Sequence, residues 1–154
     1  MATVHPVPAE WAARAQITAA VYADKYRKSL DAPEAFWREE SARIDWIKPW
    51  TKLSNCSYDE ADFGIEWFSD GTLNVSANCL DRHLAERGDV TAIIWEGDNA
   101  SQQRKLTYRE LHAEVCRMAN ALKALGAKRG DRVTIYMPMI PEAAVAMLAC
   151  SRIG

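Results

Sequence analysis

The sequence predicts an α/β fold in which a helical amino-terminal extension precedes the first strands and helices of a larger domain. Apolar residues between Pro8 and Arg43 recur near helical spacing, which predicts the extension. Near the other end, residues 130–137 have the pattern of a buried strand, and residues 141–153 that of an apolar helix. A helix after a strand normally returns the chain to a second parallel strand, which is absent before Gly154. We therefore expect an incomplete domain, the amino-terminal part of a longer protein.

The extension is expected to hold two helices and an irregular segment. Residues 31–34 (Asp-Ala-Pro-Glu) predict a capping box, with Pro33 early in the second helix. Residues 46–62 show no period and carry Trp46, Trp50 and Tyr58 among turn-forming residues. Large aromatic side chains more often pack than bind ligands, so these three are interpreted as anchors of an irregular segment.

Strand signals follow the irregular segment. Residues 64–68 predict a short strand, and Asp70-Gly71 predicts a tight turn into residues 72–75. Residues 91–96 and 104–106 predict a second hairpin, because Gly97 and its polar neighbours lie between them.

Two further helices are expected around the second hairpin. Residues 77–87 predict a short helix that ends at Gly88. The clearest helix starts at Thr107, with Glu110 at the capping-box position, and Gly126 follows its end. Its apolar residues step by three and four and predict a face packed on a sheet: Leu111, Val115, Met118, Leu122 and Leu125.

Composition and charge exclude several classes of partner. The 154 residues carry a formal net charge of −2 and no clustered basic stripe, so we expect no nucleic-acid or membrane surface. No apolar run approaches the roughly 20 residues that cross a bilayer, and the first residues lack the pattern of a signal peptide. We expect a cytoplasmic location.

The four cysteines, at positions 56, 79, 116 and 150, form no CxxC pair, which favours free thiols over a disulfide framework. One metal-binding alternative is open. Cys79 and His83, and likewise His112 and Cys116, are spaced i, i+4 on expected helices, and together they offer four zinc ligands. Buried cysteine, however, behaves as a small hydrophobic residue and needs no metal.

No other motif with recognisable chemistry is present. The sequence has neither GxxxxGK[ST] nor a GxGxxG after a strand, and its glycines are isolated in turns. His5, His83 and His112 have no partner in a nucleophile motif, and the acidic residues fall at caps, in turns and on polar helix faces. The sequence therefore nominates no catalytic, cofactor-binding or metal-binding residue in this chain.

Four stretches of the chain resemble the acetyl-coenzyme A synthetase family of adenylate-forming enzymes: residues 78–84, 92–98, 107–112 and 133–154. They occur in the family's order and extend the resemblance across nearly the whole chain. The amino-terminal helices and aromatic residues are similar to the extension that precedes the adenylation domain. The resemblance implies an extension over residues 1–63 and the start of the AMP-binding large domain over residues 64–154.

The resemblance also implies an activity for the full-length enzyme. Acetate attacks the α-phosphate of ATP with magnesium, giving acetyl-adenylate and pyrophosphate, and the thiol of coenzyme A then takes the acetyl group. The residues that bind ATP, magnesium and coenzyme A in the family lie downstream, so the chain alone is expected to be inactive and to bind no cofactor. Its uncovered strand and helix predict marginal stability or self-association, which a cooperative urea transition of a dispersed monomer would contradict.

Two alternatives accompany this interpretation. Propionyl-specific relatives share the Tyr136-Met137-Pro138-Met139 run, so a propionyl-coenzyme A synthetase is the first. The second is a naturally short, non-catalytic protein that binds a partner. Such a protein should have replaced exposed apolar residues, yet Ala143–Leu148 contains no charge.

Overall fold

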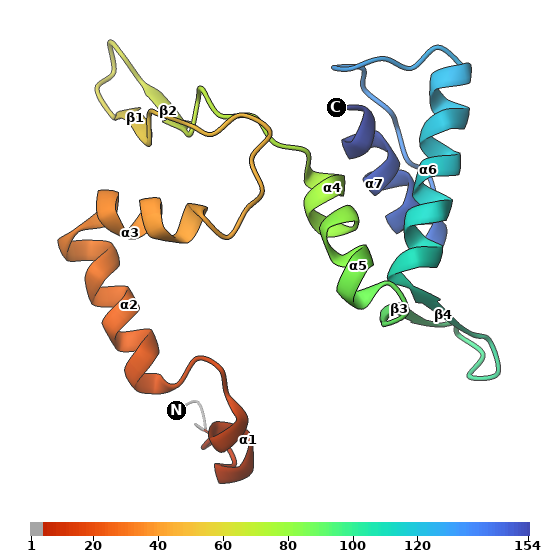
Figure 1. Cartoon of the computed structure of the whole chain (residues 1–154), viewed down its shortest axis with the longest axis horizontal. Helices are drawn as coiled ribbons and strands as arrows, with labels where there is room; N and C mark the ends of the chain where they lie inside the picture. Colours follow the sequence, from red (N-terminus) through yellow and green to blue (C-terminus); the bar gives the residue numbers. More distant parts are fainter. Residues whose placement is uncertain (1–4) are drawn as a thin grey trace. The chain divides into compact units, whose positions relative to one another are not determined.

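The computed structural model describes residues 5–154, which fall into two compact units (Figure 1). The first unit comprises residues 5–44 and 52–69 of the described chain, and the second comprises residues 45–51 and 70–154. Helices and strands are mixed, with helices predominating in the amino-terminal region, as the sequence predicts.

The first unit contains three helices, α1 (Ala9–Arg14), α2 (Ala19–Asp31) and α3 (Pro33–Ser41). Thr18 caps α2, since its hydroxyl accepts a hydrogen bond from the Val21 amide. The predicted capping box at residues 31–34 is wrong: Ala32 is the N-cap of α3, and no side chain caps it. Asp31 is still the last residue of α2, so it cannot act as the cap, whereas Pro33 does begin α3.

The same unit holds an antiparallel pair of strands, β1 (Ser54–Ser57) and β2 (Gly64–Trp67). A small hairpin or a turn is expected after residues 64–68. The turn is present at residues 69–70, but β2 pairs with β1, a stretch expected to be irregular, and not with residues 72–75. Aromatic rings pack beside this sheet: the ring centroids of Trp37 and Trp67 are 5.9 Å apart. The partner strand of β2 is thus set by its pairing with β1 and by this aromatic contact, and the turn signals in the sequence do not specify that partner.

The second unit contains four helical segments, α4 (Val75–Cys79), α5 (Leu84–Arg87), α6 (Tyr108–Ala124) and α7 (Pro141–Ile153), and a 3₁₀ turn, η1 (Asp81–His83). The strands β3 (Thr91–Glu96) and β4 (Gln103–Thr107) form the predicted antiparallel hairpin. Helices α6 and α7 pack side by side, and the hairpin contacts one end of α6 (Figure 1).

The core of the second unit lies where α6 and α7 meet η1 and the hairpin. Its buried residues are Leu80, Leu106, Leu111, Val115, Ala119, Val145 and Ala149. Arg104 on β4 binds Glu114 on α6 at 2.5 Å and Glu142 on α7 at 2.6 Å, which ties three elements together at the edge of the core. Helix α6 thus packs on the two-stranded sheet of β3 and β4, in agreement with the expectation from sequence, and also on α7.

The predicted ends of α6 are confirmed. The Thr107 hydroxyl accepts from the Glu110 amide at 3.2 Å, and the Glu110 carboxylate accepts from the Thr107 amide at 2.8 Å. Gly126 has φ of +100°, and the Ala127 and Gly126 amides donate to the carbonyls of Leu122 and Lys123, which makes a Schellman motif. The predicted apolar face is wrong only at its end, where Leu125 is 86% exposed.

The predicted helix over residues 77–87 is interrupted. Helix α4 starts earlier, at Val75, and Leu80 leaves the helical conformation with φ of −123° and ψ of −64°. This break accompanies two tertiary contacts: the Leu80 side chain is 1% exposed in the core, and Asp81 pairs with α7. Burial and ion pairing override the local helical pattern here.

The predicted strand at residues 133–137 is also absent, because residues 131–138 have no regular secondary structure. Tyr136 is fully exposed and Met139 is 90% exposed. A strand needs a neighbouring strand to accept its backbone hydrogen bonds, and none of the strands in residues 5–154 pairs with this stretch. The next loop is held by the Trp95 indole, which donates to the Met139 carbonyl at 2.8 Å.

The helices of residues 5–154 are all too short or too polar to span a bilayer. The sequence likewise contains no apolar run of that length.

Candidate functional site

The structure places the three histidines in different surroundings. His5 is exposed, and the His83 ring lies 5.5 Å from that of Tyr108. His112 joins a polar cluster with Cys116. Cys79 is exposed, and in residues 5–154 no three His, Cys, Asp or Glu side chains are grouped so that they could hold a metal ion. The four residues of the zinc alternative are therefore not gathered into one site.

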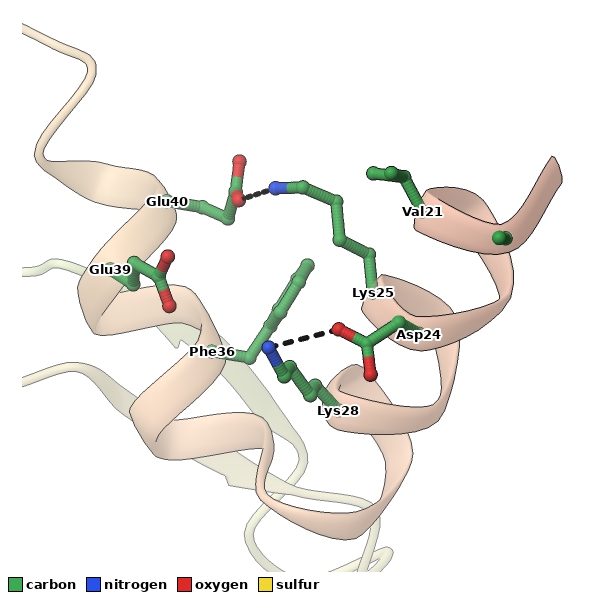
Figure 2. Close-up of a pocket in the computed structure, with 8 residues that line it drawn as sticks. Val21, Asp24, Lys25, Lys28, Phe36, Glu39 and Glu40 are labelled. Atoms are coloured by element: carbon green, nitrogen blue, oxygen red, sulfur yellow. Dashed lines mark hydrogen bonds and ion pairs between the residues drawn. The ribbon is translucent and has the colours of Figure 1, made fainter. Parts of the chain in front are cut away.

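A hollow of about 310 Å³ lies between α2 and α3 in the first unit (Figure 2). Val21 and Phe36 form apolar parts of its wall, and charged side chains from both helices line the rest. Figure 2 shows Lys25 reaching Glu40 on the facing helix, and Lys28 binding Asp24 on its own helix.

These ion pairs change the acidity of the groups in the hollow. The hydrogen bond to Lys28 lowers the pKa of Asp24, and that from Lys25 lowers the pKa of Glu40. The hydrogen bond that Lys28 donates to Asp24 also raises the pKa of Lys28. Both lysines of the hollow are thus bound by carboxylates, so its lining offers no unpaired cation to an anionic ligand.

A second polar group joins three elements of the second unit: Asp81 on η1, His112 and Cys116 on α6, and Arg152 on α7. The Arg152 guanidinium binds both oxygens of Asp81, at 2.7 and 2.8 Å. His112 Nε2 lies 3.3 Å from an Asp81 oxygen, 3.4 Å from Arg152 Nη2 and 3.5 Å from Cys116 Sγ. We call these four residues the polar cluster.

The guanidinium of Arg152 holds the pKa of Asp81 below its usual range, and Asp81 in turn raises the pKa of Arg152. Beside the cluster lies a hollow of about 420 Å³, formed by residues of α6 and α7. It is lined by Cys116, Ala119, Asn120, Lys123, Arg152 and Ile153. We call it the α6–α7 hollow; its lining contains two cations and no carboxylate.

The i, i+4 spacing of His112 and Cys116 is visible in the sequence, whereas no sequence pattern places Asp81 or Arg152 beside them. Asp81 and Arg152 are 71 residues apart, and each is an ordinary charged residue of a helical segment. No local pattern links them. Only the packing of the segment formed by α4 and η1 on α7 brings the pair together.

Comparison with known families divides the chain into two consecutive matches. The family model described as "Acetyl-coenzyme A synthetase N-terminus" matches residues 22–79, and the one described as "AMP-binding enzyme" matches residues 80–154. A protein from Novosphingobium aromaticivorans named acetyl-coenzyme A synthetase is 65% identical over 98% of this chain. The chain belongs to the acetyl-coenzyme A synthetase family.

Other members of the acetyl-coenzyme A synthetase family agree with this assignment. Proteins of that name from Parvibaculum lavamentivorans and Shewanella amazonensis are 62% and 63% identical over 98% and 99% of the chain. The solved structure of an acetoacetyl-CoA synthetase from Streptomyces lividans matches 94% of it with a TM-score of 0.75 and 32% identity. The chain spans 23% of the length of these three relatives and 22% of the solved chain.

In this member of the acetyl-coenzyme A synthetase family, the two matches meet between Cys79 and Leu80, where α4 ends and the chain enters the core. The polar cluster therefore belongs to the AMP-binding match. All four of its residues lie in that match, as does the α6–α7 hollow.

We predict that the stabilisation from Asp81 is lost in acid. Its folded pKa is lowered, so the contribution is present above the unfolded value near 3.9 and disappears as the pH falls through the folded value. Because the Asp81 side chain is 36% exposed, we expect Asp81→Asn to cost only about 1 kcal/mol at pH 7. Urea unfolding of both proteins at pH 7 and below pH 4 tests this; an unchanged difference at low pH would contradict it.

Proposed function

We propose that the chain is the amino-terminal part of an AMP-forming acetate–CoA ligase, which converts acetate, ATP and coenzyme A to acetyl-CoA, AMP and pyrophosphate through an acetyl-adenylate. The observation that carries the proposal is the 65% identity over 98% of the chain to a protein named acetyl-coenzyme A synthetase. The extension, on this proposal, covers residues 1–63, and residues 64–154 begin the large domain.

On this proposal the chain alone is inactive. Stabilising the charge that develops on a transferring phosphate needs converging amides, cations or a metal ion. Among the described residues, no three acidic, histidine or cysteine side chains are grouped as they would be around a magnesium ion, and carboxylates bind Lys25 and Lys28. On this proposal, ATP, magnesium and coenzyme A bind to other parts of the ligase, and no catalytic residue is assigned to this chain.

A chimera tests the proposal. Residues 1–154 replace the matching segment of the Novosphingobium aromaticivorans relative, and the chain alone is assayed in parallel. We expect acetate-dependent pyrophosphate release and acetyl-CoA formation from the chimera within about tenfold of the intact relative, and none from the chain. The tenfold margin corresponds to about 1.4 kcal/mol of barrier, a modest cost for exchanging one similar segment.

The matched control is a chimera that lacks the transplanted segment. If it is as active as the complete chimera, or if the complete chimera is inactive although folded, the proposal fails. Propionate, supplied beside acetate, tests the propionyl alternative, since a preference for propionate in the chimera but not in the relative would favour it.

We also propose that the chain alone self-associates and that the ligase is cytoplasmic. Val133, Ile135 and Met137 are at least 36% exposed on an unpaired extended stretch, which supports self-association. Four free cysteines support a reducing compartment. Sedimentation of the chain prepared for the assay tests self-association, which a monomer at every concentration would contradict. Fractionation of the native cell tests the cytoplasmic location.

A further inference from the structure

We propose that Cys116 is a modification site that forms mixed disulfides with small anionic disulfides. The inference rests on the polar cluster and the α6–α7 hollow, and it does not depend on the ligase activity. Three features carry it: a proton acceptor beside the thiol, a cationic hollow open to the thiol, and a carboxylate that stabilises the protonated acceptor.

The proton acceptor is His112. Its Nε2 lies 3.5 Å from Cys116 Sγ, and both side chains project from α6 one turn apart. The thiolate is the reactive form of cysteine, so a group that takes the thiol proton promotes attack on a disulfide. Nε2 is also 3.3 Å from Asp81, which accepts a hydrogen bond from the imidazolium once the proton has moved.

The α6–α7 hollow selects the charge of the reagent. Cys116 lines it together with Lys123 and Arg152, and no carboxylate belongs to the lining. Arg152 directs two of its N–H groups at Asp81, and a third lies near His112 Nε2; a guanidinium carries five, so two donors remain. A carboxylate or phosphate on a small disulfide would find the Lys123 ammonium there, together with the remaining donors of Arg152.

The surroundings of Cys56 differ from those of Cys116. Cys56 is exposed on β1, and its thiol has a backbone carbonyl, that of Glu66, as its neighbour at 3.7 Å. Among residues 5–154, no hydrogen bond joins Cys56 to a histidine or a cation. Cys56 therefore serves as the internal reference, an exposed thiol that, in the described part of the chain, has no neighbouring proton acceptor or cation of the kind that Cys116 has.

The reaction is a thiol–disulfide exchange. The Cys116 proton passes to His112 Nε2, the thiolate attacks one sulfur of the reagent, and the reagent's S–S bond breaks. The other half leaves with the electron pair as a thiolate. Cys116 is oxidised to the mixed disulfide, and the departing half of the reagent, which is the oxidant, is reduced.

The test compares an anionic aromatic disulfide, 5,5′-dithiobis(2-nitrobenzoate), with the neutral 2,2′-dithiodipyridine. Rates at each cysteine of the 154-residue chain are read by acid quenching and peptide mass spectrometry. For each cysteine we compare one ratio, the rate constant with the anionic reagent divided by the rate constant with the neutral reagent. We expect this ratio to be about tenfold higher at Cys116 than at Cys56, and the difference to vanish in urea.

Three variants separate the contributions. Lys123→Met should lower the ratio at Cys116 about threefold, whereas Lys105→Met, an exposed lysine on β4, should leave it unchanged. His112→Asn should slow both reagents at Cys116 about tenfold without changing the ratio. Variants that merely unfold would instead make all four cysteines equally reactive.

A ratio at Cys116 no higher than at Cys56, or one that Lys123→Met does not change, would overturn the proposal. The same measurement on the active chimera decides whether the site exists in the assembled ligase. Modification of Cys116 there supports the proposal, and full protection of Cys116 overturns it.

Discussion

Leu111→Ala is expected to lower the free energy of unfolding of the second unit by about 3 kcal/mol. Leu111 is 4% exposed and belongs to the core between α6 and α7. The substitution loses the transfer free energy of the buried methyl groups and leaves a cavity that packed neighbours fill only in part. A single domain has only about 5–15 kcal/mol of stability, so the folded population should fall markedly. Urea unfolding followed by helical circular dichroism measures the change.

The matched control is Leu125→Ala, at the other end of the same predicted apolar face. Leu125 is 86% exposed, so its removal should change the free energy of unfolding by less than about 0.5 kcal/mol. Equal losses from the two substitutions would show that Leu125 is buried in solution and that the described end of α6 is wrong.

Asn74→Ala is expected to cost about 2 kcal/mol, because this one side chain serves two helices. Its Oδ1 accepts from the Ala77 amide at 3.0 Å and caps α4. Its Nδ2 donates to the carbonyls of Ser151 and Arg152 at the end of α7, each at 3.2 Å. Alanine removes all three hydrogen bonds and leaves carbonyls at the end of α7 without these donors. Thermal or urea unfolding measures the loss.

Asn74→Ser separates the two roles. Serine is nearly as good an N-cap as asparagine but cannot reach α7 with two N–H donors, so it should recover about half of the loss. If serine were as costly as alanine, the cap would contribute nothing. If serine restored full stability, the bonds to α7 would be unimportant.

Local signals predicted those elements whose ends are encoded by neighbouring residues. Thr107 and Glu110 form the predicted capping box, and Gly126 takes the left-handed conformation that ends α6. The hairpin of β3 and β4 was likewise predicted, since its strands are close in sequence. The resemblance carried by residues 78–84 and 133–154 also led to the family that the comparisons established.

Long-range contacts explain where prediction failed. β2 pairs with β1 instead of residues 72–75, and Leu80 breaks a helical pattern to enter the core. Residues 133–137 have strand-forming side chains but no strand beside them among the described residues, so their pattern alone does not form a sheet.

The sequence by itself determined the ends of α6, the β3–β4 hairpin and the family, because each depends on residues that are neighbours in the chain or on motifs of fixed order. Only the tertiary structure decided that Asp81 and Arg152, 71 residues apart, meet beside His112 and Cys116. The physical reason is that Asp81 reaches Arg152 only where the α4–η1 segment packs on α7, and His112 and Cys116 join them only where α6 packs on α7. Burial of apolar area drives both contacts. The α6–α7 hollow and its cationic lining arise from the packing of α6 on α7.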